Sequence, residues 1–177
     1  VGNTDYSVTY ASQTGDLDDG TAKGVALSAS MTHAEVGYTL TSLMDSHFGF
    51  SFHQDTGNDA STTEKDEAYR PLFYDIHANA ALSDKRKWGN LTYTSFGWEL
   101  SPLEKTVFGF GYFIFSKTHV ASGAESSLGN ETQVTIKKKY EDGVTLAGRY
   151  SVIEPGKGDG SNLKTENQFF TSVTWNF

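Results

Sequence analysis

Three basic side chains give this sequence its clearest chemical signal. Lys137 and Lys139 share one phase of an alternating run, and Arg149 has the matching phase in the next run. Because every second side chain of a strand points to the same face, we expect all three on one inner wall. In a pore, fixed positive charge attracts anionic solutes. In a closed barrel, the same side chains would form a buried polar network with Glu99 and its neighbours.

The same alternation assigns further polar and aromatic side chains to this inner wall. Gln133 and Asn176 belong to it. The residues that we predict to line a pore are Lys137, Lys139, Arg149, Glu99, Tyr93 and His53.

Ser51, His53 and Asp55 have the residue types of an enzyme that acts on lipid A. Alternation places all three on one face of a strand, so the geometry allows such a group. Triplets of this kind arise easily in serine-rich strands, and the sequence has no G-x-S-x-G, phosphate-loop or dinucleotide motif. We therefore predict that the protein is not an enzyme and has no catalytic residues.

The sequence shows no pattern of metal ligands. His47 and His53 share a face but lie about 20 Å apart at the rise of an extended strand. The acidic run at 16–20 lacks the glutamate that ends a calcium-binding EF-hand loop. There are no cysteines, which excludes thiolate sites and disulfides and fits a protein of the cell envelope. We expect neither a metal nor a cofactor.

Composition favours strands over helices. The chain has 177 residues, a net charge of -8 and a mean hydropathy of -0.45. The acidic balance makes nucleic acid an improbable partner, because phosphate binding needs a basic face. Glycine (18) and aromatic residues (14%) are plentiful while proline (3) is scarce. A spanning helix needs about 20 apolar residues, and no such run exists.

Period-two alternation predicts a single all-β domain over 1–177, with strands near 4–12, 22–41, 46–56, 88–100, 105–118, 129–140, 143–154 and 166–177. Short turns alternate with long polar loops, which is typical of an antiparallel up-and-down transmembrane β-barrel. A soluble β-sandwich also alternates, but its strands are shorter. Within 24–40 the apolar phase reverses near His33 and Ala34, which predicts a β-bulge.

The outward face of this barrel would meet lipid. We expect it to carry Phe48, Phe50, Trp98, Phe108, Phe110, Tyr112, Val173, Trp175 and Phe177. Trp175 and the terminal Phe177 resemble the C-terminal assembly signal of bacterial outer-membrane proteins. The expected location is therefore the bacterial outer membrane, and the expected partners are its lipid, lipopolysaccharide and the barrel assembly machinery.

One long loop, 57–87, is polar at first and then becomes apolar. Such a loop must bury its apolar side chains, either inside the lumen as a constriction or against the rim. The candidate constriction residues are Tyr69, Arg70, Phe73 and Tyr74. The basic run at 84–87 could touch lipid A phosphates or simply be solvated.

Five segments resemble the second half of the alginate-export family of outer-membrane porins. YASQTGD at 10–16 is similar to the family's Y-x-x-Q-x-G-D, and EVGYTL at 35–40 to its E-L-G-Y strand. HFGFSFHQDTGN at 47–58 is similar to L-G-Y-D-x-x-S-G-D. YRPLFYDIH at 69–77 is similar to F-D-P-L-F-P-x-x-H, and YSVIEPG at 150–156 to Y-S-x-F-x-P-G.

The resemblance implies a passive channel for anionic solutes or polysaccharide. The chain departs from the pattern at Arg70, where the family has an acid, and at Tyr74, where it has a proline. The family spans the membrane with about twice as many strands. The chain is then either a small relative that closes on itself, filled by its own side chains, or the C-terminal part of a larger pore.

Overall fold

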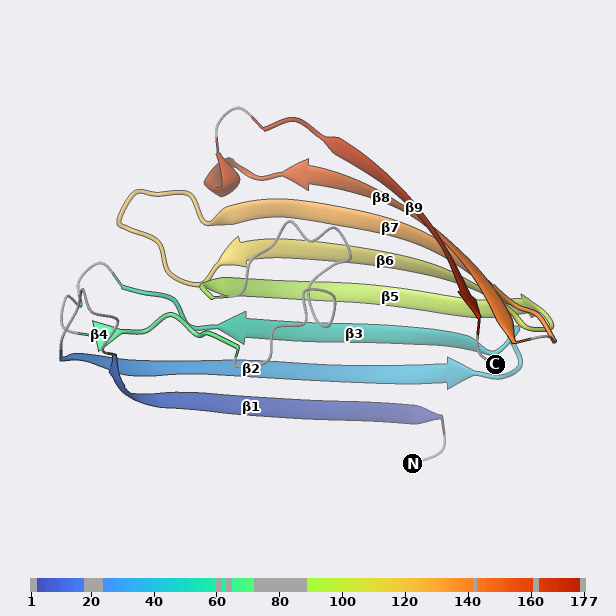
Figure 1. The fold of residues 1–177 in the computed structure, drawn as a ribbon, viewed down its shortest axis with the longest axis horizontal. Coiled ribbons are helices and arrows are strands. Elements are labelled where there is room, and N and C mark those ends of the chain that lie inside the picture. The colour runs from blue at the N-terminus through green and yellow to red at the C-terminus, as the bar shows by residue number, and fades with distance from the viewer. Residues whose placement is uncertain are drawn as a thin grey trace.

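The computed structural model describes residues 3–17, 24–59, 62, 65–71, 89–141, 143–160 and 163–175. These residues form an all-β protein (Figure 1). Eight long strands follow the chain: β1 (Thr4–Leu17), β2 (Val25–Leu40), β3 (Ser46–Asp55), β5 (Leu91–Leu103), β6 (Thr106–Lys117), β7 (Ser127–Lys139), β8 (Val144–Pro155) and β9 (Glu166–Trp175). A two-residue strand, β4 (Lys65–Asp66), and a 3-10 turn, η1 (Lys157–Asp159), complete the elements.

Each long strand pairs antiparallel with the next one along the chain, so the sheet has up-and-down topology. The order is β1-β2-β3-β5-β6-β7-β8-β9, and β4 adds to β2 in parallel. Among the described residues, β1 and β9 each pair on one side only, so the sheet is open (Figure 1). The predicted all-β, up-and-down fold is confirmed.

The outer face of the sheet is apolar. Phe48, Trp98, Phe110 and Val134 lie side by side in one register row across β3 to β7. Phe48 and Trp98 stack with their rings 3° from parallel. The eight described residues that we expected on the outward face all lie here, whereas Phe177 lies outside the described residues.

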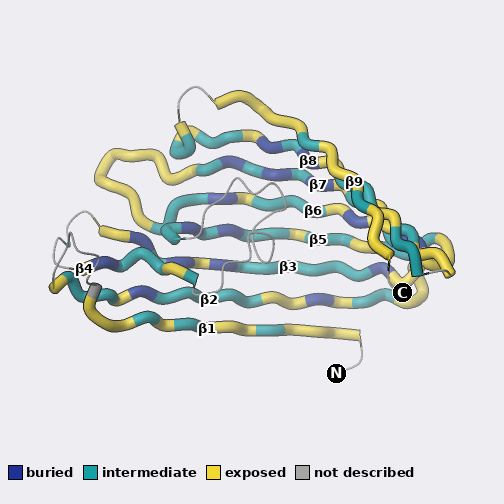
Figure 2. The backbone as a smooth tube through the Cα atoms, viewed as in Figure 1, coloured by how far each residue is buried: buried dark blue, intermediate teal, exposed yellow. Residues whose placement is uncertain are grey.

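The inner face carries the buried side chains. Leu91, Tyr93 and Phe115 form the hydrophobic cluster, with Phe113 and Leu128 packed against it. All three cluster members are at most 2% exposed. Figure 2 shows that burial is concentrated in the middle strands, while the edge strands β1 and β9 are largely exposed.

The bulge predicted in β2 is wrong. The strand pairs with β1 and with β3 without any register shift. Leu27, Ala29 and Met31 share the inner-face phase, and Val36 and Tyr38 share the outer-face phase. The apolar side chains of β2 therefore change face without any break in the strand. In its first half they point to the inner face, and in its second half they point to the outer face.

Two further boundaries differ from the sequence prediction. β1 continues to Leu17, where it pairs with Val25, although we expected a loop from Gln13. The long loop also contributes β4, which was not predicted because two residues carry no periodic signal. In the part of the chain that the structure describes, no helix is long and apolar enough to cross a membrane.

Replacing Leu91 by alanine tests the inner cluster. We expect the free energy of unfolding to fall by about 2–5 kcal/mol, because a fully buried leucine leaves a cavity. Urea titration followed by tryptophan fluorescence measures this change. The matched control is Leu163→Ala, where the side chain is 50% exposed and the loss should stay below about 0.5 kcal/mol. Equal losses in the two variants would contradict the assigned core.

Candidate functional site

All six residues predicted to line a pore lie on the inner face, but in two separate zones. Lys137, Lys139 and Arg149 occupy β7 and β8 on the side of the β7–β8 turn. Arg149 faces Phe170 across the β8–β9 pair, and its guanidinium carbon lies 5.2 Å from the ring centre. Glu99 stands on β5, opposite His47 of β3.

The other two residues, His53 and Tyr93, belong to an aromatic layer near the loop end of the sheet. This layer consists of His33, His53, Tyr93 and Phe115, which face one another in register across β2, β3, β5 and β6. His53 and Tyr93 stack with ring centres 4.9 Å apart, and His33 lies 5.7 Å from His53. Since His53 and Tyr93 are at most 2% exposed, this layer is packed protein interior.

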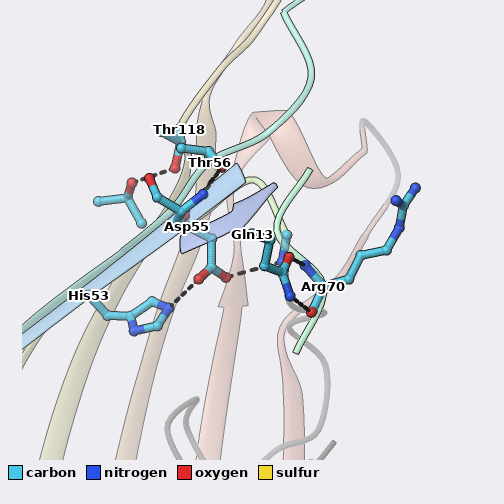
Figure 3. A network of polar contacts seen from close by, with 9 residues as sticks. Gln13, His53, Asp55, Thr56, Arg70 and Thr118 are labelled. Atoms are coloured by element: carbon cyan, nitrogen blue, oxygen red, sulfur yellow. Dashed lines mark hydrogen bonds and ion pairs between the residues drawn. The ribbon is translucent and has the colours of Figure 1, made fainter. Parts of the chain in front are cut away.

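The suspected Ser-His-Asp triplet is only partly assembled. His53 Nε2 lies 2.9 Å from Asp55 Oδ1 (Figure 3), and both side chains are buried. The other Asp55 oxygen accepts a hydrogen bond of 3.1 Å from the backbone N–H of Gly89. The Ser51 hydroxyl is instead hydrogen-bonded to the Ser95 hydroxyl, with 2.6 Å between the two oxygens. Asp55 thus joins β3 to the start of β5, a structural role that needs no nucleophile.

The beginning of the long loop is tied to the inner face at β1. The Gln13 side-chain amide donates to the carbonyl of Arg70 and accepts from its backbone N–H at 2.9 Å (Figure 3). The Arg70 guanidinium pairs with Asp66 at 2.5 Å, and Asp66 belongs to β4. Burial raises the pKa of the Tyr69 phenol, and the Asp55 carboxylate raises it further. Of the four predicted constriction residues, Phe73 and Tyr74 lie outside the described residues.

A group of acidic residues lies on the inner face of β1 to β5 and was not predicted as a site. His47 Nε2 lies 3.1 Å from Asp5 Oδ2. Glu35 accepts a hydrogen bond of 2.8 Å from the Ser7 hydroxyl and lies 3.6 Å from His33. Alternation could have put Glu35 and His47 on this face, but only the register brings β1, β2, β3 and β5 together.

Four glycines cross the same region in one register row. Gly37, Gly49, Gly97 and Gly111 are consecutive neighbours on β2, β3, β5 and β6. A Cβ atom at Gly37 would collide with the side chains of Asp5 and His47. Because these four residues carry no side chain into the space above them, a cavity of about 410 Å³ opens there.

The structure describes only part of the other predicted features. Trp175 ends β9 and is 65% exposed, while its partner in the assembly signal, Phe177, lies outside the described residues. Asp16 is at the end of β1, and the rest of the acidic run at 18–20 is likewise outside them. Among the described residues, no three histidines or acids lie close enough to hold a metal ion.

Replacing Gln13 by alanine tests the loop anchor. We expect amide hydrogen exchange at Arg70 to accelerate about thirtyfold, because two hydrogen bonds of the order of 1 kcal/mol each are lost. Exchange measured by mass spectrometry on peptides covering 65–71 reports this change. Thr14→Ala alters the neighbouring residue, which faces outward, and should leave exchange unchanged. Unchanged exchange in Gln13→Ala would refute the anchor.

Comparison with known proteins does not assign the chain to a family. No protein-family model matches the chain, and no curated protein matches it. The similarity to alginate-export porins therefore rests on the sequence segments quoted above.

Proposed function

We propose that this chain forms the wall of an outer-membrane β-barrel channel that passes solutes passively. The observation that carries this proposal is the division between the two faces of one continuous sheet. The outer face exposes large apolar side chains in every long strand, among them Phe50, Phe96 and Phe110, whereas most of the charged side chains of these strands lie on the inner face. Contact with lipid accounts for such an apolar surface, which water would otherwise penalise.

The basic zone of the inner face supports passage of anionic solutes. Lys137 and Lys139 are exposed on β7, and Arg149 stands on the neighbouring strand. Their positive charge would raise the local concentration of anions at the turn end of the lumen. Polysaccharides rich in carboxylates, as the family resemblance implies, are one class of such solutes.

A second candidate function is a closed barrel with an anchoring role in the outer membrane. The packed layer of His33, His53, Tyr93 and Phe115 favours it, because side chains that fill a lumen leave no open path. A lipid A-modifying enzyme has less support, since Ser51 is bonded to Ser95 rather than presented to His53.

Single-channel recording in planar bilayers separates the channel from the anchoring barrel. We expect discrete conductance steps from the purified chain or, if the gene encodes a longer product, from that product. A complete product that inserts but never conducts would replace the channel with the anchoring barrel. Insertion is checked independently by heat-modifiable migration on gels.

Anion preference has its own test in the same recordings. Replacing Lys137, Lys139 and Arg149 together by glutamine should shift the reversal potential toward cations, because three fixed positive charges leave the lumen. The control replaces Lys117 and Lys157, which lie at the opposite end of the strands, by glutamine. Equal shifts in the two variants would reject the assigned residues while leaving the channel in place.

A further inference from the structure

The outer face of the sheet has a groove across β6 to β9. It measures about 620 Å³, within the roughly 300–1,000 Å³ of pockets that hold a small molecule. Its floor is Gly148 on β8, whose register neighbours are Ile136 on β7 and Thr171 on β9. Because Gly148 has no side chain and Thr171 has a short one, the larger side chains of the adjoining register rows stand above this floor as walls.

The walls of the groove are apolar. Tyr150 and Phe169 stand on the loop side of the floor, and Leu146 and Val173 stand on the turn side. The Tyr150 hydroxyl donates to Asn167 Oδ1 at 3.1 Å, which holds this ring against β9. The four wall side chains are at least 40% exposed, so the protein itself does not cover them. An apolar chain lying in the groove removes this surface from water.

A cationic side chain stands at the turn side of the groove. Lys138 lines it, and the Lys138 ammonium group donates to the backbone carbonyl of Glu104 at 3.0 Å. An ammonium group has three N–H donors, and no carboxylate of the described residues pairs with this one. The other cation of the lining, Arg149, has its guanidinium over the ring of Phe170 on the inner face. The groove therefore combines an apolar trough with a cation that has spare donors at one end.

The position of Lys138 along the strand indicates the depth of this cation in a bilayer. The inference rests on the proposed function, in which the outer face meets lipid. Lys138 lies near the β7–β8 turn, and the exposed Trp175 pairs with Val144 at the same end. Exposed aromatic residues at strand ends mark the boundary between hydrocarbon and head groups around a barrel. A lysine at that depth extends its ammonium group toward the head groups.

We propose that this groove binds one anionic glycerophospholipid. One acyl chain lies over Gly148 and Thr171 between the two apolar walls, and the phosphate accepts hydrogen bonds from the Lys138 ammonium group. The short turns of an outer-membrane barrel face the periplasm, so Lys138 lies in the leaflet made of glycerophospholipid rather than lipopolysaccharide. Since the chain has a net charge of -8, its attraction for an anion is local to this site rather than general.

Native mass spectrometry of the full chain in detergent micelles tests the site. After delipidation, the protein is titrated with dioleoylphosphatidylglycerol, and we expect saturable binding of one phospholipid per chain. Dioleoylglycerol has the same two acyl chains and no phosphate. It should bind about tenfold more weakly, since a charge-assisted contact is missing.

Two lysine variants test the contact with the phosphate. Lys138→Gln should weaken binding of phosphatidylglycerol about tenfold and leave binding of dioleoylglycerol unchanged. The matched control is Lys117→Gln, which removes the same charge at the loop end of β6. This control should bind phosphatidylglycerol as the unmodified chain does.

A second pair of variants tests the shape of the groove. A Cβ at Gly148 would stand 3.4 Å from the nearest atom, in Ile136, so Gly148→Leu fits the sheet and fills the floor. Thr132→Leu is the control on the outer face of β7, outside the groove. We expect Gly148→Leu to abolish saturable binding and Thr132→Leu to retain it, with the same heat-modifiable migration on gels in both.

Four results would overturn the proposal: no saturable binding of one phospholipid, equal binding of phosphatidylglycerol and dioleoylglycerol, equal weakening by the two lysine variants, or full binding by Gly148→Leu. The titration needs a chain that folds in detergent but not an open pore. A chain that conducts and does not bind phospholipid would reject this site alone. A chain that binds phospholipid and does not conduct would support the site and reject the channel.

Discussion

The structure depends on one constraint: seven antiparallel strand pairs hold register over most of their length, so each strand's two faces continue those of its neighbours. The register shifts only at one end of the β5–β6 pair and one end of the β6–β7 pair. Side chains alternate with period two, and a slip of one residue would exchange the two faces of a strand. The pairs β2–β3, β3–β5, β7–β8 and β8–β9 run without a register shift. The aromatic outer face and the charged inner face are both consequences of these ladders.

The inner face is not uniform along the strands. Near the loop end, His53, Tyr93 and Phe115 fill the space with stacked rings. In the middle, glycines replace side chains and open a cavity with acidic walls. At the turn end, Lys137 and Lys139 reverse the sign of the charge.

The long loop is coupled to the inner face through side chains rather than through the sheet alone. Asp55 bonds the backbone of Gly89, where the chain returns to β5. Gln13 holds Arg70, and Arg70 holds Asp66 of β4. These contacts connect β1, β3 and β5 at one end of the sheet. They also commit Asp55 and Arg70 to structure, which is why residue types suited to catalysis or constriction do not by themselves identify a site.

Alternation in the sequence predicts the eight long strands and the face of the side chains within them, because alternation is a local property, but it does not predict where β1 and β5 end. It correctly paired Phe48 with the outward set and Lys137 with the inward set. The bulge predicted in β2 is wrong, because apolar side chains that switch from one face to the other give the same sequence pattern whether or not the strand has a bulge. Only the tertiary structure brought Glu35, Glu99 and Gln133 around one cavity and aligned Gly37 with Gly49, Gly97 and Gly111. These residues are far apart in the chain. They become neighbours through the pairing of several strands, and the alternation within one strand does not specify how it pairs with the next.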